Sequence, residues 1–156
     1  MTVVGIDVGT KGGLTALDDT GALIESVPMP RTKDKTRSFF GDVADFIRKH
    51  SPSKVMIEQV GAMPKQGVVS MFKFGTNFGG LLGVVEALKV PYELIRPQAW
   101  RKLTLANDIK AMKIDNKKQV EIMVKRLWPS ANWIAPRCRT THDGMTDSAL
   151  IALSGI

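Results

Sequence analysis

Residues 2–30 read TVVGIDVGTKGGLTALDDTGALIESVPMP, and this stretch decides the fold of the 156-residue chain. The apolar run Thr2–Val8 predicts a buried strand, and the glycines at 9, 12 and 13 predict the turn that follows it. GLTALDD and ALIESVPMP predict two further short strands, with the hairpin signal DTG between them. We therefore expect an antiparallel meander of three strands.

The rest of the chain alternates between helical and strand patterns. Apolar residues at helical spacing predict helices over 36–50, 70–89, 117–128 and 142–156. Strands are predicted over 54–60 and from Tyr92 until Pro97 ends the fifth strand. Residues 101–114 are expected to form a loop with a short helical turn. Two helix caps are expected. Thr36 or Ser38 would cap the first helix, and Asp115 or Asn116 would cap the third.

A meander followed by strands that are joined through helices predicts a mixed sheet. The fold class is therefore α/β, with a five-stranded sheet, three antiparallel strands then two parallel ones, flanked by helices. The length suits a single domain over residues 1–156.

Composition restricts the setting in which the protein works. No run of about 18 apolar residues is evident, and the N-terminus lacks the pattern of a secretion signal. The single cysteine, Cys138, fits a reducing compartment and has no partner pattern for zinc. We expect a soluble, cytoplasmic protein without a membrane partner.

The charge is unevenly distributed along the chain. The net charge is +7, from 22 basic and 15 acidic residues. The segment 96–126 alone contains nine basic and three acidic residues. Such asymmetry indicates either a basic face for a polyanion, most often nucleic acid, or simply a solvated surface.

Four acids occupy positions from which they can meet. Asp7 and Glu58 each lie near the end of a short apolar strand, and each is followed by a turn that contains glycine. Asp143 and Asp147 are four residues apart on the predicted last helix and therefore share a face. Like charges at this spacing destabilise a helix unless an ion or a basic partner compensates them. Each acid alone is equally consistent with a solvated carboxylate.

Together, four converging carboxylates suit hard divalent cations such as Mg²⁺. Two such ions, roughly 3.5 to 4 Å apart, activate water and stabilise the leaving oxygen of a phosphodiester. Because carboxylates repel DNA, the basic segment must hold the backbone. In this reading the glycines after Asp7 make room for metal and DNA, and Lys11 steadies the backbone.

Three motifs, GIDVG at the start, IEQV after the fourth strand and HDGMTDSALIA at the end, resemble the RuvC-like Holliday junction resolvases of the RNase H-like superfamily. MPKQGVVSMFKFGTNFG and RPQAW are also similar to the short bacteriophage-type members. The resemblance implies an RNase H-like fold and a homodimer that cuts opposed strands of a four-way junction. It implies a metal-binding tetrad, with Mg²⁺ or Mn²⁺ and two ions in each site, formed by Asp7, Glu58, Asp143 and Asp147.

The chain departs from the family pattern at two places. Many relatives space the last two ligands three apart, whereas these are four apart, which leaves His142 as a substitute ligand or a general base. Relatives often place a wedging aromatic residue after the catalytic glutamate. Here Gly61, Ala62 and Met63 occupy those positions, and the first aromatic residues are Phe72 and Phe74.

The resemblance also assigns the phosphate-binding residues. Lysines before and at the start of the third long helix hold phosphate in the family, which points to Lys102, Lys117 and Lys118, with Arg101 beside them. Lys118 is also a candidate general base. Glycines 75, 79 and 83 recur on one face of the second helix, at a cost of roughly 1 kcal/mol each against alanine. Either a dimer interface or close packing on the protein's own sheet explains them.

Three functions are weighed. The first is a metal-dependent endonuclease, acting on DNA in the cytoplasm of a bacterium or a phage-infected bacterial host without a nucleotide cofactor. The second is a non-catalytic protein that binds branched DNA. The third follows from DVGT, which also resembles the first phosphate loop of actin-like ATPases and sugar kinases, although those proteins need a second domain and a second glycine-rich loop.

Overall fold

A computed structural model describes residues 1–31, 39–61 and 67–156 of the chain. Its centre is one five-stranded sheet in the order β3-β2-β1-β4-β5. The first three strands pair antiparallel, and β4 pairs parallel with both β1 and β5. The strands are β1 (Thr2–Asp7), β2 (Gly13–Asp18), β3 (Leu23–Pro28), β4 (Lys54–Glu58) and β5 (Tyr92–Ile95). The predicted mixed sheet is confirmed.

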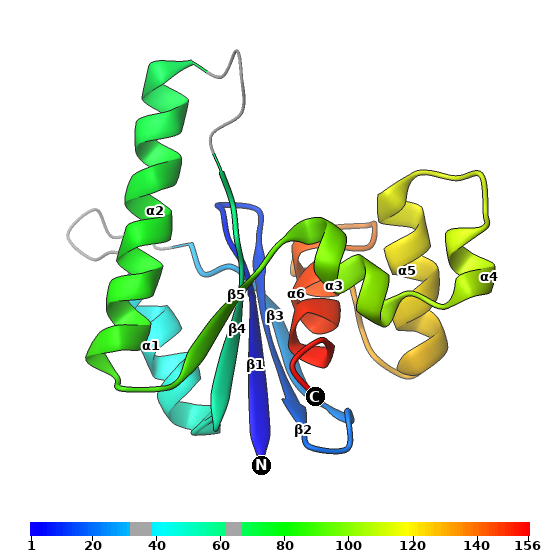
Figure 1. Cartoon of the computed structure of the whole chain (residues 1–156), viewed down its shortest axis with the longest axis horizontal. Helices are drawn as coiled ribbons and strands as arrows, with labels where there is room; N and C mark the ends of the chain where they lie inside the picture. The colour runs from blue at the N-terminus through cyan, green and yellow to red at the C-terminus, as the bar shows by residue number, and fades with distance from the viewer. Residues whose placement is uncertain (32–38, 62–66) are drawn as a thin grey trace.

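Helices cover both faces of the sheet (Figure 1). The helices are α1 (Phe39–His50), α2 (Val68–Ala87), α3 (Pro97–Thr104), α4 (Asn107–Lys110), α5 (Asn116–Leu127) and α6 (Asp143–Leu153). One core cluster joins the sheet to α1 and α2, and a second joins it to α6 and to α3, α4 and α5. α6 lies directly on β1 and β2, and α5 packs behind it.

The region after β5 differs from the prediction. Residues 101–114 were expected to be mainly loop, but Pro97 occupies the first turn of α3, and α4 follows after a short break. Proline suits the first turn because the amide hydrogen it lacks has no helical partner there. The predicted cap of α5 is confirmed, since the Asp115 carboxylate accepts a hydrogen bond of 3.0 Å from the Lys118 amide. The caps expected at Thr36 and Ser38 lie outside the described residues.

Small residues let α6 approach the sheet closely. A Cβ atom at Gly5 of β1 would overlap the Ser148 carbonyl and the Ala152 amide of α6. The Thr15 hydroxyl of β2 lies 2.8 Å from the Ser148 hydroxyl, which fixes the register of the helix on the sheet. Since alternate residues of a strand share a face, Asp7 points to the same side as Gly5. The packing of α6 therefore places its acids beside the end of β1.

Gly5→Ala should test this close approach. We expect a loss of roughly 1 to 3 kcal/mol in the free energy of unfolding, because backbone atoms of α6 cannot rotate away from the new methyl group. Urea denaturation followed by circular dichroism measures the change. Gly41→Ala in α1, where no described atom lies within 4 Å of the added Cβ, is the control and should not be destabilised. Equal stability of the two variants would contradict the packing argument.

The outer face of α2 has no partner among the described residues. Cβ atoms added at Gly75, Gly79 and Gly83 meet nothing within 4 Å, so the explanation by packing on the protein's own sheet is wrong for these three glycines. Val68 and Phe72 are 83% and 78% exposed near the start of the helix. By length and composition alone α2 is also apolar enough to cross a membrane, contrary to the sequence expectation.

Candidate active site

Two acids meet where β1 and β4 end. Asp7 is the last residue of β1 and Glu58 is the last residue of β4. The two strands are parallel neighbours with Ile6 opposite Ile57, so their carboxyl ends lie at the same edge of the sheet. Gly5, two residues before Asp7, lies against α6. Met56, two residues before Glu58, belongs to the core cluster that contains the buried residues of α6. Both acids therefore point to the α6 side of the sheet.

The carboxylates are close enough to change one another's protonation. Burial raises the pKa of Asp7 well above its ordinary value, and the charges of Glu58, Asp147 and Asp143 raise it further, together with a hydrogen bond to Glu58. Burial also raises the pKa of Asp147 to about 7, opposed by Arg101 and assisted by Glu58 and Asp143. The site thus concentrates more negative charge than it can hold without protons or cations.

Asp143 is more exposed than the other three acids. It begins α6, and its Oδ2 lies 2.7 Å from Nζ of Lys117, at the start of α5. The side chains of Lys117 and Asp143 are 72% and 50% exposed, and ion pairs at such a surface contribute little to stability. Lys117 therefore lies at the rim of the acid site and is released from Asp143 at small cost.

Trp100 of α3 fixes the orientation of Glu58. Its indole Nε1 donates a hydrogen bond of 3.0 Å to Glu58 Oε1, and the side chain is fully buried. The Arg101 guanidinium lies 4.8 Å from the centre of the same indole ring. The motif RPQAW by itself predicts no role for Trp100. The available signal was chemical, because a buried indole N–H needs an acceptor.

Trp100→Phe should separate this contact from packing. Phenylalanine keeps much of the apolar volume but removes the donor, so Glu58 loses the group that orients it. If the acids serve the metal-dependent nuclease that the sequence motifs predict, the rate of DNA cleavage should fall by roughly 10- to 100-fold, as is usual when a partner of a metal ligand is removed. Single-turnover cleavage measures the effect, and thermal unfolding checks the fold. A wild-type cleavage rate in a folded variant would contradict the positioning role.

The donor set fits a divalent cation better than any other group. All four candidate ligands are carboxylates, and hard cations such as Mg²⁺ prefer oxygen ligands. The raised pKa of Asp7 and of Asp147 indicates the same need for positive charge. Within the described ranges, however, no three acidic, histidine or cysteine side chains are already gathered as a metal site. The pair between Asp143 and Lys117 keeps one carboxylate at the rim, and the ligand assignment stays a prediction.

The two candidate general bases are engaged elsewhere. His142 is the N-cap of α6, and its Nδ1 accepts a hydrogen bond of 3.3 Å from the Met145 amide. Burial lowers its pKa, so the ring is neutral at pH 7 and its other nitrogen carries the proton. Nζ of Lys118 lies 2.8 Å from Glu121 Oε2 on the same helix. The structure therefore pairs Lys117, and not Lys118, with an acid of the site.

The remaining predicted residues differ in their relation to the site. The charge of Arg101 reaches Asp147, whereas Lys102 is exposed and offers its carbonyl to Nζ of Lys110 at 2.7 Å. Lys11 is exposed in the turn after β1, next to the start of α6. Of the positions considered for a wedge, Ala62 and Met63 lie outside the described residues. Gly61, Phe72 and Phe74 are described, and Phe72 is exposed on α2.

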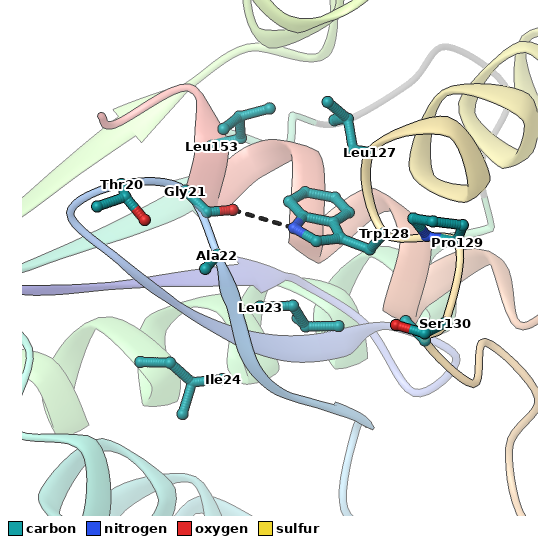
Figure 2. A pocket seen from close by; sticks show the side chains of 11 residues that line it. Thr20, Gly21, Ala22, Leu23, Ile24, Leu127, Trp128, Pro129, Ser130 and Leu153 are labelled. Carbon is teal, nitrogen blue, oxygen red and sulfur yellow. Dashed lines mark hydrogen bonds between the residues drawn. The ribbon is translucent and has the colours of Figure 1, made fainter.

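A hollow lies at the opposite end of the sheet from Asp7 and Glu58. Its volume is about 660 Å³, and it separates the β2–β3 turn from the end of α5 (Figure 2). Trp128 spans it, because its Nε1 donates a hydrogen bond of 3.0 Å to the Gly21 carbonyl. None of the described residues that line this hollow is charged. We therefore assign the contact between Trp128 and Gly21 a structural role and place the chemistry at the carboxylate edge.

Solved structures with a similar fold include Holliday junction resolvases. T. thermophilus RuvC in complex with Holliday junction substrate matches with a TM-score of 0.67 and 21% identity, over 99% of this chain and 91% of that chain. A second Thermus thermophilus RuvC structure matches with a TM-score of 0.59 and 21% identity, over 99% and 92%. The yeast mitochondrial resolvase Ydc2 matches with a TM-score of 0.52 and 16% identity, over 97% and 76%.

No protein-family model and no curated protein sequence matches the chain. The RNase H-like fold of RuvC, which the sequence motifs predicted, is confirmed by the structural matches.

Proposed function

We propose that the protein is a structure-selective DNA endonuclease that resolves four-way junctions and related branched DNA by metal-dependent hydrolysis. The observation that supports this most is the crowding of Asp7, Glu58 and Asp147 at one sheet edge, with Asp143 and Lys117 at its rim. The fold adds support, since RuvC has been solved with a Holliday junction substrate on the same architecture. The proposed place of action is the cytoplasm of a bacterium or a phage-infected host.

The mechanism assigns separate tasks to the residues of the site. Asp7, Glu58, Asp143 and Asp147 would hold Mg²⁺ or Mn²⁺, as one or two ions. Bound there, divalent cations would supply the Lewis acidity that makes water a nucleophile at neutral pH and stabilises the leaving oxygen. Lys117 exchanges Asp143 for a backbone phosphate, and Trp100 keeps the Glu58 carboxylate oriented. Water adds to phosphorus in line as the bond to the 3′ oxygen breaks.

A homodimer would supply the two cuts that a symmetric junction requires, because a two-fold axis relates both sites and both target strands. The uncovered face of α2 is the proposed interface. Its three glycines leave space for a second helix, and Val68 and Phe72 offer exposed apolar surface. The competing reading of this face is contact with lipid, given the length and composition of α2.

Phe72→Glu should distinguish these readings of α2. A buried carboxylate in a dimer interface costs several kcal/mol, so we expect the variant to sediment as a monomer at micromolar concentration. The wild type should sediment as a dimer without detergent or lipid. Lys73→Glu, on the same exposed stretch and with a larger change in charge, is the control and should retain the dimer. A monomeric wild type that binds vesicles would contradict the interface.

The proposed activity is tested with end-labelled four-way, three-way and linear DNA, with and without Mg²⁺. We expect paired cuts in the four-way junction, no cuts with EDTA, and binding that weakens steeply with salt, as phosphate contacts require. Equal cutting of linear duplex would indicate a general nuclease. Tight binding without cutting at any metal concentration would favour the non-catalytic alternative. Nucleotide hydrolysis without DNA cleavage would favour the phosphotransferase.

A further inference from the structure

A basic groove lies beside the carboxylate edge, the sheet edge at which Asp7 and Glu58 lie, and the proposed mechanism gives it no role. It is formed by Thr10 in the β1–β2 turn, residues 28–31 after β3, residues 135–138, and His142. Its volume is about 470 Å³, within the range of sites that hold a ligand. Thr10 is three residues from Asp7, and His142 directly precedes Asp143. The groove therefore begins where the acid site ends.

The charge of the groove is positive. Arg31 and Arg137 line it and are exposed, and no carboxylate does. Among the described side chains, Arg137 pairs with no acid, and neither does the neighbouring Arg139. Lys117 and Lys118, by contrast, each pair with a carboxylate. Arg31 and Arg137 therefore offer two exposed positive charges in the described part of the groove.

The backbone holds Arg137 in an uncommon conformation. Its φ is +66°, in the left-handed region that favours glycine or asparagine. The isolated bridge between Ile134 and Thr141 closes the loop around it, and the Cys138 amide donates to the Ala135 carbonyl at 3.0 Å. The loop thus places Arg137 at the groove that it lines.

We propose that this basic groove binds the sugar-phosphate backbone of one duplex arm of the branched DNA, with Arg31 and Arg137 contacting phosphates. The proposal rests on the proposed function and extends it. The groove adds a contact surface next to the start of α6, where Lys117 pairs with Asp143 at the rim of the acid site. Phosphate is the anion that guanidinium groups bind in forked geometry.

The unique cysteine provides a direct test. Cys138 is exposed in the groove, and the chain contains no other cysteine, so a maleimide labels one site. The protein carries Asp7→Asn to prevent cutting, and its labelling rate is measured with and without saturating four-way junction. We expect the junction to slow labelling at least about fivefold and 1 M salt to restore the rate of free protein, since the contacts are electrostatic.

Charge variants test the same surface by affinity. Arg137→Asn suits the left-handed backbone and removes the charge, and Arg31→Gln removes the other. Each should weaken junction binding roughly 3- to 10-fold and reduce the slope of log affinity against log salt by about 1. Arg137→Lys should restore the slope. Arg48→Gln, which removes a charge from exposed α1, is the matched control and should change neither quantity.

The outcomes separate the two proposals. If the junction binds but Cys138 is labelled at the free rate, and the groove variants bind as Arg48→Gln does, the groove proposal is overturned and the nuclease proposal stands. If no branched DNA binds at all, both are overturned.

Discussion

Asp7→Asn is expected to abolish cleavage of a four-way junction while leaving its binding intact. The substitution removes a buried negative charge at the centre of the acid cluster and keeps the size of the side chain. Because the amide is a poor ligand for hard cations, the cleavage rate should fall by at least about 1,000-fold, comparable with the loss of a principal transition-state contact. Junction affinity should stay within about threefold, since one charge that repels phosphate has gone.

Single-turnover cleavage and gel-shift titration measure the two quantities on the same DNA. Asp45→Asn is the matched control, because it makes the same chemical change on exposed α1, where Asp45 pairs with Arg48 at 3.1 Å. It should cut at the wild-type rate. Unchanged cutting by Asp7→Asn, or loss of both binding and cutting in a variant with normal thermal unfolding, would refute the carboxylate assignment.

The second large effect is on stability. Asp147 has a folded pKa of about 7 against an ordinary value of 3.8, so between about pH 4 and pH 7 the folded chain binds a proton that the unfolded chain releases. The free energy of unfolding therefore falls as pH rises through this window and is flat above it. The raised pKa of Asp7 acts in the same direction. The metal-free protein should be less stable at pH 8 than at pH 5.5.

The expected difference from Asp147 alone is about 2 kcal/mol, or roughly 4 to 8 °C in the unfolding midpoint. The lowered pKa of His142 acts in the opposite direction below about pH 6.5 and reduces the net difference, whereas Glu121 contributes no change in this window. Lys118, Lys125 and Thr141 lower the pKa of Glu121 to about 2, and this contribution changes only below about pH 4.5. Differential scanning calorimetry in EDTA measures the midpoint at both values of pH.

Asp147→Asn should reduce this pH dependence and raise the midpoint of the metal-free protein at pH 8. Millimolar Mg²⁺ should raise the wild-type midpoint more at pH 8 than at pH 5.5, because protons and cations compete for the same carboxylates. The variant should lose most of the shift that Mg²⁺ produces. A wild-type midpoint that is higher at pH 8 than at pH 5.5 in EDTA would contradict the crowding of these acids.

Much of the fold could be predicted because it depends on local patterns. The glycine turn after Asp7 and the DTG turn specify the meander, and the strand ending at Glu58 follows a helix, which makes it parallel to β1. Two acids at the ends of adjacent parallel strands must share an edge of the sheet. The fifth strand ends before Pro97 as predicted, but the helix that begins there was not predicted, since proline ends a strand and begins a helix with equal ease, and only the residues after it decide between them.

The site could be predicted as a set of residues but not as an arrangement. Asp7, Glu58, Asp143 and Asp147 were identified from strand ends and helical spacing. The contact between Trp100 and Glu58, the pairing of Lys117 with Asp143, and the engagement of Lys118 by Glu121 were not. Each depends on which rotamer and which neighbouring helix meet across the core, and local spacing does not determine this.

The sequence by itself determined the succession of strands and helices along the chain, the two strand ends that carry Asp7 and Glu58 and the helix that carries the other two acids, because periodicity and turn chemistry act over a few residues. Tertiary structure alone decided how close α6 comes to β1, since Gly5 and Ser148 lie far apart in the chain. That approach, together with burial, raises the pKa of Asp7 and Asp147. Tertiary structure also decided that the glycine face of α2 points outward and that Arg31 and Arg137 line one groove, because both depend on how distant segments pack.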